Sequence, residues 1–169
     1  MKPEFIDTMA ETVYYLSAGH GCVITSASST RSTEKIEYSN MKRYLPKSKD
    51  DIQAVDFLQS CPFDVVKSDI SKLLEFLQDT HWEVSEGIAK YLKSYVNEIK
   101  SDLLYILNSN DDEWKRRTLM VLIGRSSYKL DQELILALRR IAEHPTTGEI
   151  EEEVVEQAKE IIIKNNRLK

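Results

Sequence analysis

Two short polar stretches of the chain combine carboxylates with a tryptophan at matching positions, QDTHW at residues 78–82 and NDDEW at residues 110–114. Each stretch lies between apolar segments that have helical spacing. Carboxylates that converge at one edge of a fold can bind a metal ion or transfer protons, whereas carboxylates at helix starts accept hydrogen bonds from exposed backbone N–H groups. We interpret the stretches as equivalent turns in which the aspartates cap helices and the tryptophans pack inside.

The same turns are the candidate binding rim of the chain. If equivalent turns lie along one edge of the fold, their side chains form a continuous rim that can contact a partner protein. The residues that we expect at this rim are Asp79, Trp82, Asp111, Trp114 and Arg116. Tryptophan and arginine are enriched among the residues that dominate protein interfaces. The rim is therefore a hypothesis for protein binding, set against the structural roles of the same residues.

Six of the basic residues after the start of the second turn are candidates for a charged site: Lys115, Arg116, Arg117, Arg125, Arg139 and Arg140. On a helix, residues 115–117 point to different faces, so at most two of them serve one surface. Salt bridges with the acidic turns are the structural explanation, and a site for an anion or an acidic partner is the functional one. Clustering of Arg116 with the three later arginines would instead form a basic groove for nucleic acid.

Recognisable catalytic and metal-binding motifs are missing from the sequence. It contains no H-E-x-x-H pair, no G-x-S-x-G elbow, no Gly-rich phosphate loop and no zinc-ligand spacing. The three histidines, His20, His81 and His144, lie far apart along the chain. We therefore expect no catalytic residues, no bound metal and no cofactor. A hydrolase that uses Asp79, His81 and Asp112 is the least favoured alternative.

The composition is that of a globular protein with one domain and an appended segment. Of the 169 residues, 41% are hydrophobic and 30% are charged, which is enough apolar material for a core. The formal net charge of -5 argues against general binding of polyanions, since domains that bind them carry a positive excess. Cys22 and Cys61 lack a C-x-x-C pattern, which suggests a reducing compartment.

The N-terminal residues do not have the pattern of an export signal. Glu4, Asp7 and Glu11 interrupt the apolar region that such a signal needs. No apolar run of the sequence approaches the roughly 18 residues that span a bilayer. From these observations and the unpaired cysteines, we expect a cytoplasmic protein.

The spacing of apolar residues predicts an all-α fold. Residues 1–18 are expected to contain an N-terminal helix, and residues 19–43 a Ser/Thr-rich linker or mobile arm. A further helix is expected at residues 49–60, capped by Ser48 with Asp51 as its partner in a capping box. Helical hairpins then begin near residues 64, 99 and 131, with a period of roughly 33 residues.

Residues 44–169 are therefore predicted to form one helical repeat domain. A single helical hairpin buries only one of its sides, so hairpins need neighbours. The expected architecture is a short right-handed stack of antiparallel helical hairpins, with about seven to eight helices including the N-terminal one. The final helix has an acidic run at residues 149–156 and a basic end, which complements the helix dipole and suits an outer position. A structural role is thus the first interpretation of the acidic run, and partner binding is the alternative.

Four segments of this domain resemble one bacterial protein family. They are LPKSKDDIQAV (45–55), LLEFLQDTHWEV (73–84), NDDEWKRRTLMVLI (110–123) and RRIAEHPTTGEIEEEVVEQAKEII (139–162). In this order they resemble the domain of unknown function 5071 family, over about residues 44–163. The resemblance implies a small HEAT-like helical repeat fold and no established activity. A proline often follows the first tryptophan in that family, whereas Glu83 stands at this position here.

Taken together, the sequence favours a non-enzymatic protein-interaction module over an enzyme. The partner is expected to be a protein, and an immunity-type or adaptor protein is the specific version of this hypothesis. The alternative is a HEAT-like protein that binds nucleic acid through a local basic groove, which the acidic net charge disfavours. We expect no interaction with a membrane, and the sequence leaves the oligomeric state open.

Overall fold

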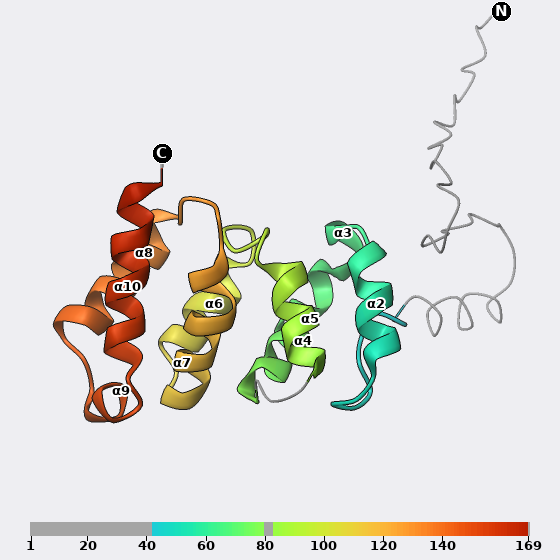
Figure 1. The fold of residues 1–169 in the computed structure, drawn as a ribbon, viewed down its shortest axis with the longest axis horizontal. Helices are drawn as coiled ribbons and strands as arrows, with labels where there is room; N and C mark the ends of the chain where they lie inside the picture. Colours follow the sequence, from blue (N-terminus) through green and yellow to red (C-terminus); the bar gives the residue numbers. More distant parts are fainter. Residues whose placement is uncertain (1–41, 80–82, 169) are drawn as a thin grey trace, which may run out of the picture.

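The computed structural model describes residues 42–79 and 83–168, whose regular secondary structure is helical throughout (Figure 1). The predicted all-α class is therefore confirmed. The expected N-terminal helix at residues 1–18, most of the linker at 19–43, and the residues His81 and Trp82 lie outside the described residues. Within the described ranges, no helix combines the length and the apolarity that crossing a bilayer requires.

The helices follow one another in a row from α2 at one end to α10 at the other (Figure 1). The α-helices are α2 (Ile52–Ser60), α3 (Phe63–Val66), α4 (Ile70–Glu75), α5 (Glu83–Leu92), α6 (Lys100–Leu107), α7 (Asp112–Val121), α8 (Gln132–Glu143), α9 (Thr147–Glu151) and α10 (Val154–Arg167). Three short 3-10 helices connect them: η1 (Lys67–Asp69), η2 (Phe76–Gln78) and η3 (Ile123–Arg125). The predicted hairpin starts near 64, 99 and 131 agree with the starts of α3, α6 and α8.

Neighbouring helical pairs pack on one another along the row. Helix α2 contacts α5, η2 contacts α7, α6 contacts α8, and α7 contacts α10. Within the last pair, α8 and α10 form the most extensive contact. Successive helices along the row are therefore in direct contact with one another.

One continuous core runs through the row of helices. Its fully buried side chains recur at spacings of three and four residues, as in Leu73, Leu74 and Leu77 before the first turn and Leu103, Ile106 and Leu107 before the second. Each such leucine or isoleucine contributes about 1.5–3 kcal/mol relative to an exposed position. The core thereby fixes the register of the polar turns between the helices.

The start of α2 differs from the prediction. The helix begins at Ile52 rather than residue 49, and Asp51 rather than Ser48 is its N-cap. The Asp51 carboxylate accepts hydrogen bonds from the backbone N–H groups of Ala54, at 3.2 Å, and Lys47, at 3.1 Å. A carboxylate that satisfies donors on both sides fixes the helix start at this residue, so the predicted capping by Ser48 is wrong.

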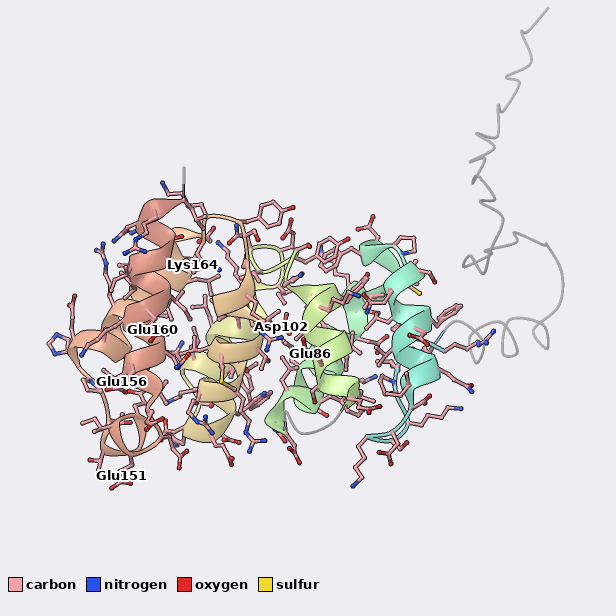
Figure 2. All side chains as sticks on the ribbon, viewed as in Figure 1. Glu86, Asp102, Glu151, Glu156, Glu160 and Lys164 are labelled. Atoms are coloured by element: carbon pink, nitrogen blue, oxygen red, sulfur yellow. The ribbon has the colours of Figure 1, made fainter. Side chains whose placement is uncertain are left out.

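The predicted final return helix is two helices, α9 and α10. Glu153 separates them with a φ of 56°, the left-handed region that non-glycine residues rarely adopt. Helix α10 has Glu156 in its first turn and Lys164 and Arg167 in its last, which complements the helix dipole as predicted. Figure 2 shows Glu156, Glu160 and Lys164 along α10 at the end of the row.

Candidate functional site

A lysine and a glutamate are buried together where α7 approaches α9. The side chain of Lys115 is 3% exposed and that of Glu149 is fully buried. The Lys115 ammonium donates hydrogen bonds of 2.8 Å to Glu149 Oε1 and to Asp112 Oδ1. Asp112 and Lys115 lie one turn apart on α7, a spacing that places both side chains on one face. This face joins α7 to α9.

Arg140 of α8 completes the charged cluster. Its guanidinium group donates to both oxygens of Glu149, at 2.6 Å and 2.8 Å, in a bidentate arrangement. It also donates to the backbone oxygen of Leu107, at 3.1 Å, at the end of α6. We call Asp112, Lys115, Arg140 and Glu149 the charged cluster. Its bonds tie together the ends of α6, α7, α8 and α9.

The local sequence explains why Glu149 points inward. Thr146 is the N-cap of α9, and its hydroxyl accepts from the backbone N–H of Glu149 at 3.2 Å. In return, Glu149 Oε2 accepts from the backbone N–H of Thr146 at 2.9 Å, which completes a capping box. The capping box turns the carboxylate back towards the turn, where Lys115 and Arg140 reach it.

The environment of Glu149 favours its ionised form. Burial by itself would raise the pKa of this carboxyl, but hydrogen bonds from Arg140, Lys115 and the backbone of Thr146 lower the pKa from the ordinary value of 4.5 to about 2. Glu149 is therefore a carboxylate at neutral pH, and the cluster contains two cations and two anions. Its charges balance internally.

A polar pocket of about 470 Å³ opens above the charged cluster. Its lining consists of the four cluster residues and of residues from two turns, which we call the wall residues. The wall residues are Asn108, Ser109 and Asn110 between α6 and α7, and Thr146, Thr147 and Gly148 before and within α9. Gly148 approaches Asp112 so closely that a Cβ at this position would overlap Asp112 Oδ2. The start of α9 thus lies directly against the start of α7 at this point.

The predicted rim residues have separate local partners. Asp111 is the N-cap of α7 and accepts from the backbone N–H of Trp114 at 2.9 Å. Trp114 packs against the core, and its Nε1 donates to the backbone oxygen of Leu74 at 3.1 Å. Asp79 pairs with Arg117 at 3.2 Å. The capping and packing interpretations therefore hold for Asp111 and Trp114, while Trp82 lies outside the described residues.

The three basic residues that directly follow the second turn do not all serve one surface, as the helical spacing predicts. Lys115 is bonded to Glu149, Arg117 to Asp79 and Glu113, and Arg116 lies 4.0 Å from Glu152. Two later arginines also have acidic partners, Arg125 with Glu86 and Arg140 with Glu149. Salt bridges thus account for these five side chains.

A second buried carboxylate lies at the opposite end of the row. Asp69 is 1% exposed and accepts from the Tyr44 hydroxyl at 2.8 Å, Lys72 at 2.9 Å and Lys42 at 3.0 Å. Burial would raise the pKa of this carboxyl, but the two lysines and the tyrosine hold it well below its usual range. No grouping of three His, Cys, Asp or Glu side chains with metal-binding geometry occurs among the residues described. The hydrogen bonds from Lys42 and Tyr44 to Asp69 attach the start of the domain to the helices that follow.

The sequence contains one pattern that could have identified Glu149 of the charged cluster, but Glu149 lies within a longer acidic run. The helix-dipole interpretation treats residues 149–156 as one acidic run at the start of an outer helix and does not single out Glu149. The pattern Thr146-x-x-Glu149 is the one that a capping box requires, and it distinguishes Glu149 from Glu151, Glu152 and Glu153. Its pairing with Lys115 and Arg140 needs the fold, because those residues are 34 and 9 positions away.

Residues 44–162 match the family described as Domain of unknown function (DUF5071). The chain belongs to this family. The match covers nearly the same range as the sequence resemblance, and it includes every residue of the polar pocket. No curated protein matches the chain. The pocket is thus a feature of the DUF5071 region itself.

Proposed function

We propose that this DUF5071 domain is a non-enzymatic module that binds a partner protein at the rim of the polar pocket. The rim consists of residues 108–111 and 144–148, the two turns that flank the pocket. This proposal keeps the second turn of the predicted rim. It replaces Trp114, which packs inward, by the exposed polar residues around it.

The observation that carries the proposal is the charged cluster beneath the pocket. Its hydrogen bonds of 2.6–3.1 Å hold Leu107 and Asp112, which flank the turn at residues 108–111, and Thr146 of the turn at residues 144–148. A surface that is already ordered loses less conformational entropy when a partner binds, and this raises affinity. The side chains of Asn108 and Asn110 remain exposed above this rigid base and can contact the partner.

The family resemblance supports a more specific version of the proposal, in which the domain is a HEAT-like stack with an immunity-type or adaptor role. A HEAT-like stack presents its turns along an edge, where several of them can contact one partner. Under this proposal the domain acts in the bacterial cytoplasm, as an immunity-type protein that covers a toxin or as an adaptor. The analogy of fold supports this version, since a small rigid stack with an ordered rim suits both roles.

Binding of nucleic acid is the alternative, and the pairing of three of the four arginines considered for a basic groove disfavours it. Arg116, Arg125 and Arg140 each lie within 4.0 Å of a carboxylate, so their charges are locally compensated. Affinity for DNA depends on basic side chains that can neutralise phosphates, and it falls steeply with salt. Fluorescence anisotropy with a labelled DNA duplex at low salt tests this alternative. Binding that weakens steeply with added salt would favour it over the protein partner.

Co-purification from native cell extract with matched variants tests the protein-binding proposal. Thr147→Arg places a long cation at the pocket wall, on a residue that is exposed and does not cap α9. Gln53→Arg makes the same kind of change on the exposed surface of α2, at the other end of the row. A specific protein that the wild type and Gln53→Arg retain and Thr147→Arg loses supports the proposal. A protein retained equally by all three, or none at all, contradicts it.

A further inference from the structure

The polar pocket offers one cation and one anion to a ligand. Of its four charged side chains, Lys115 and Glu149 are almost or fully buried, whereas Arg140 is 36% and Asp112 is 18% exposed. A chain of ion pairs, from Asp112 to Lys115 to Glu149 to Arg140, connects the two accessible groups. A ligand in the pocket therefore meets a donor and an acceptor whose positions are fixed relative to each other.

Both accessible groups retain capacity for further hydrogen bonds. A guanidinium group has five N–H donors. Among the residues that the structure describes, Arg140 uses three of them, two for Glu149 and one for the Leu107 backbone oxygen. Asp112 uses Oδ1 for Lys115, and its Oδ2 lies beside Gly148 at the pocket wall. A ligand can thus accept from Arg140 and donate to Asp112 without breaking the cluster.

The internal charge balance selects against charged ligands. Because two cations already match two anions, a carboxylate or phosphate would face Asp112 without a donor of its own. A ligand ammonium group would in turn face Arg140. An unpaired charge in such a site is costly, and this penalty provides specificity. An uncharged group with both an acceptor and donors matches the site, and the side-chain carboxamide of asparagine or glutamine is such a group.

We infer that the pocket recognises an uncharged carboxamide side chain, Asn or Gln, presented by an exposed turn of the partner protein. The inference rests on the proposed function, because it takes the carboxamide from a bound protein. The carboxamide oxygen accepts from Arg140, and its amide nitrogen donates to Asp112. The volume of about 470 Å³ holds such a side chain together with part of its backbone.

Two small probes test the inference without knowledge of the partner. The full chain is titrated with N-acetylglutamine N-methylamide and, separately, with N-acetylglutamate N-methylamide, while backbone amide shifts are followed by NMR. The two probes share their backbone amides and differ only in the side-chain group. We expect the glutamine probe to shift the amides of Ser109, Asn110 and Gly148, and the glutamate probe to bind at least about tenfold more weakly.

The variants of the co-purification experiment serve as controls. Thr147→Arg abolishes binding of the glutamine probe and Gln53→Arg preserves it if the pocket is the site. Equal binding of both probes, or shifts confined to other regions, overturns the inference.

The probe titration and the co-purification together separate the inference from the proposed function. If neither probe binds and Thr147→Arg still loses the partner, the carboxamide inference is wrong and the proposed function stands. If the glutamine probe binds the pocket and Thr147→Arg retains every protein that the wild type retains, the inference about ligand chemistry stands and the protein-binding proposal is wrong.

Discussion

At the scale of single residues, Glu149 connects the stability of the domain to the shape of the pocket. It accepts hydrogen bonds from Lys115, Arg140 and the backbone of Thr146, and no part of its side chain is exposed. A buried ion pair adds little net stability compared with an apolar pair of the same size, but removal of one partner leaves the other charge buried and unmatched. The cluster is therefore expected to be sensitive to single substitutions.

Glu149→Gln is expected to lower the free energy of unfolding by about 3 kcal/mol. The amide keeps the size of the side chain, but it removes the negative charge that Lys115 and Arg140 require. Urea denaturation followed by circular dichroism measures the change. Glu151→Gln, on the exposed side of the same helix, is the matched control and should leave the unfolding midpoint nearly unchanged. Equal losses in both variants would show that the buried charge has no special role.

The stability of the domain is expected to fall in acid. The folded-state pKa of Glu149 lies at about 2, below the ordinary value of 4.5, so its ionisation stabilises the fold above that ordinary value. The contribution, about 3 kcal/mol, is lost as the pH falls from about 5 towards 2. Asp69, whose pKa is also lowered, acts in the same direction. Unfolding midpoints measured in urea between pH 7 and pH 3 should drop steeply for the wild type and less steeply for Glu149→Gln; parallel curves would refute this assignment.

At the scale of the elements, helix starts and close helix contacts fix the turns. Asp111 caps α7 and Thr146 caps α9, so each turn that flanks the pocket ends at a capped helix. At the other end of the row, α5 approaches α2 through Gly87, which lies directly against Val55. These contacts set where the helices begin and how closely they pack.

Asp111→Ala is expected to destabilise the domain by about 1 kcal/mol, because α7 loses the acceptor for the Trp114 backbone N–H. Asn110→Ala, at the neighbouring exposed position, is the control and changes no cap. The two variants can be compared by thermal unfolding. A larger loss in Asn110→Ala than in Asp111→Ala would mean that the cap does not determine the start of α7.

Gly87→Ala is expected to push α5 away from α2. The new Cβ would overlap Cγ1 of Val55, a buried and β-branched side chain with little freedom to move. Overpacking costs about 1–3 kcal/mol and outweighs the gain in helix propensity of about 1 kcal/mol. In a Val55→Ala background the overlap disappears, and the same Gly87→Ala change should then stabilise the domain. Guanidinium denaturation of the four proteins measures this reversal, and destabilisation of equal size in both backgrounds would rule out the contact as its cause.

At the scale of the whole molecule, the sequence predicted what depends on local spacing and missed what depends on tertiary contacts. Apolar residues at intervals of three and four led to the helical class and to hairpin starts that agree with α3, α6 and α8. The prediction chose Ser48 as the N-cap of α2, whereas the structure has Asp51 in that position. The cluster of Lys115, Arg140 and Glu149 joins three helical elements, so no window of the sequence shows it.

The whole row of helices also gives the protein-binding proposal its most direct test. Hydrogen exchange followed by mass spectrometry compares the free protein with its complex with the protein retained in the co-purification. We predict slower exchange at residues 108–112 and 144–149, the two turns around the pocket, and unchanged exchange in α2 at the other end. Slower exchange confined to α2 and α5, with both pocket turns unaffected, would contradict the proposal that the pocket rim is the binding surface.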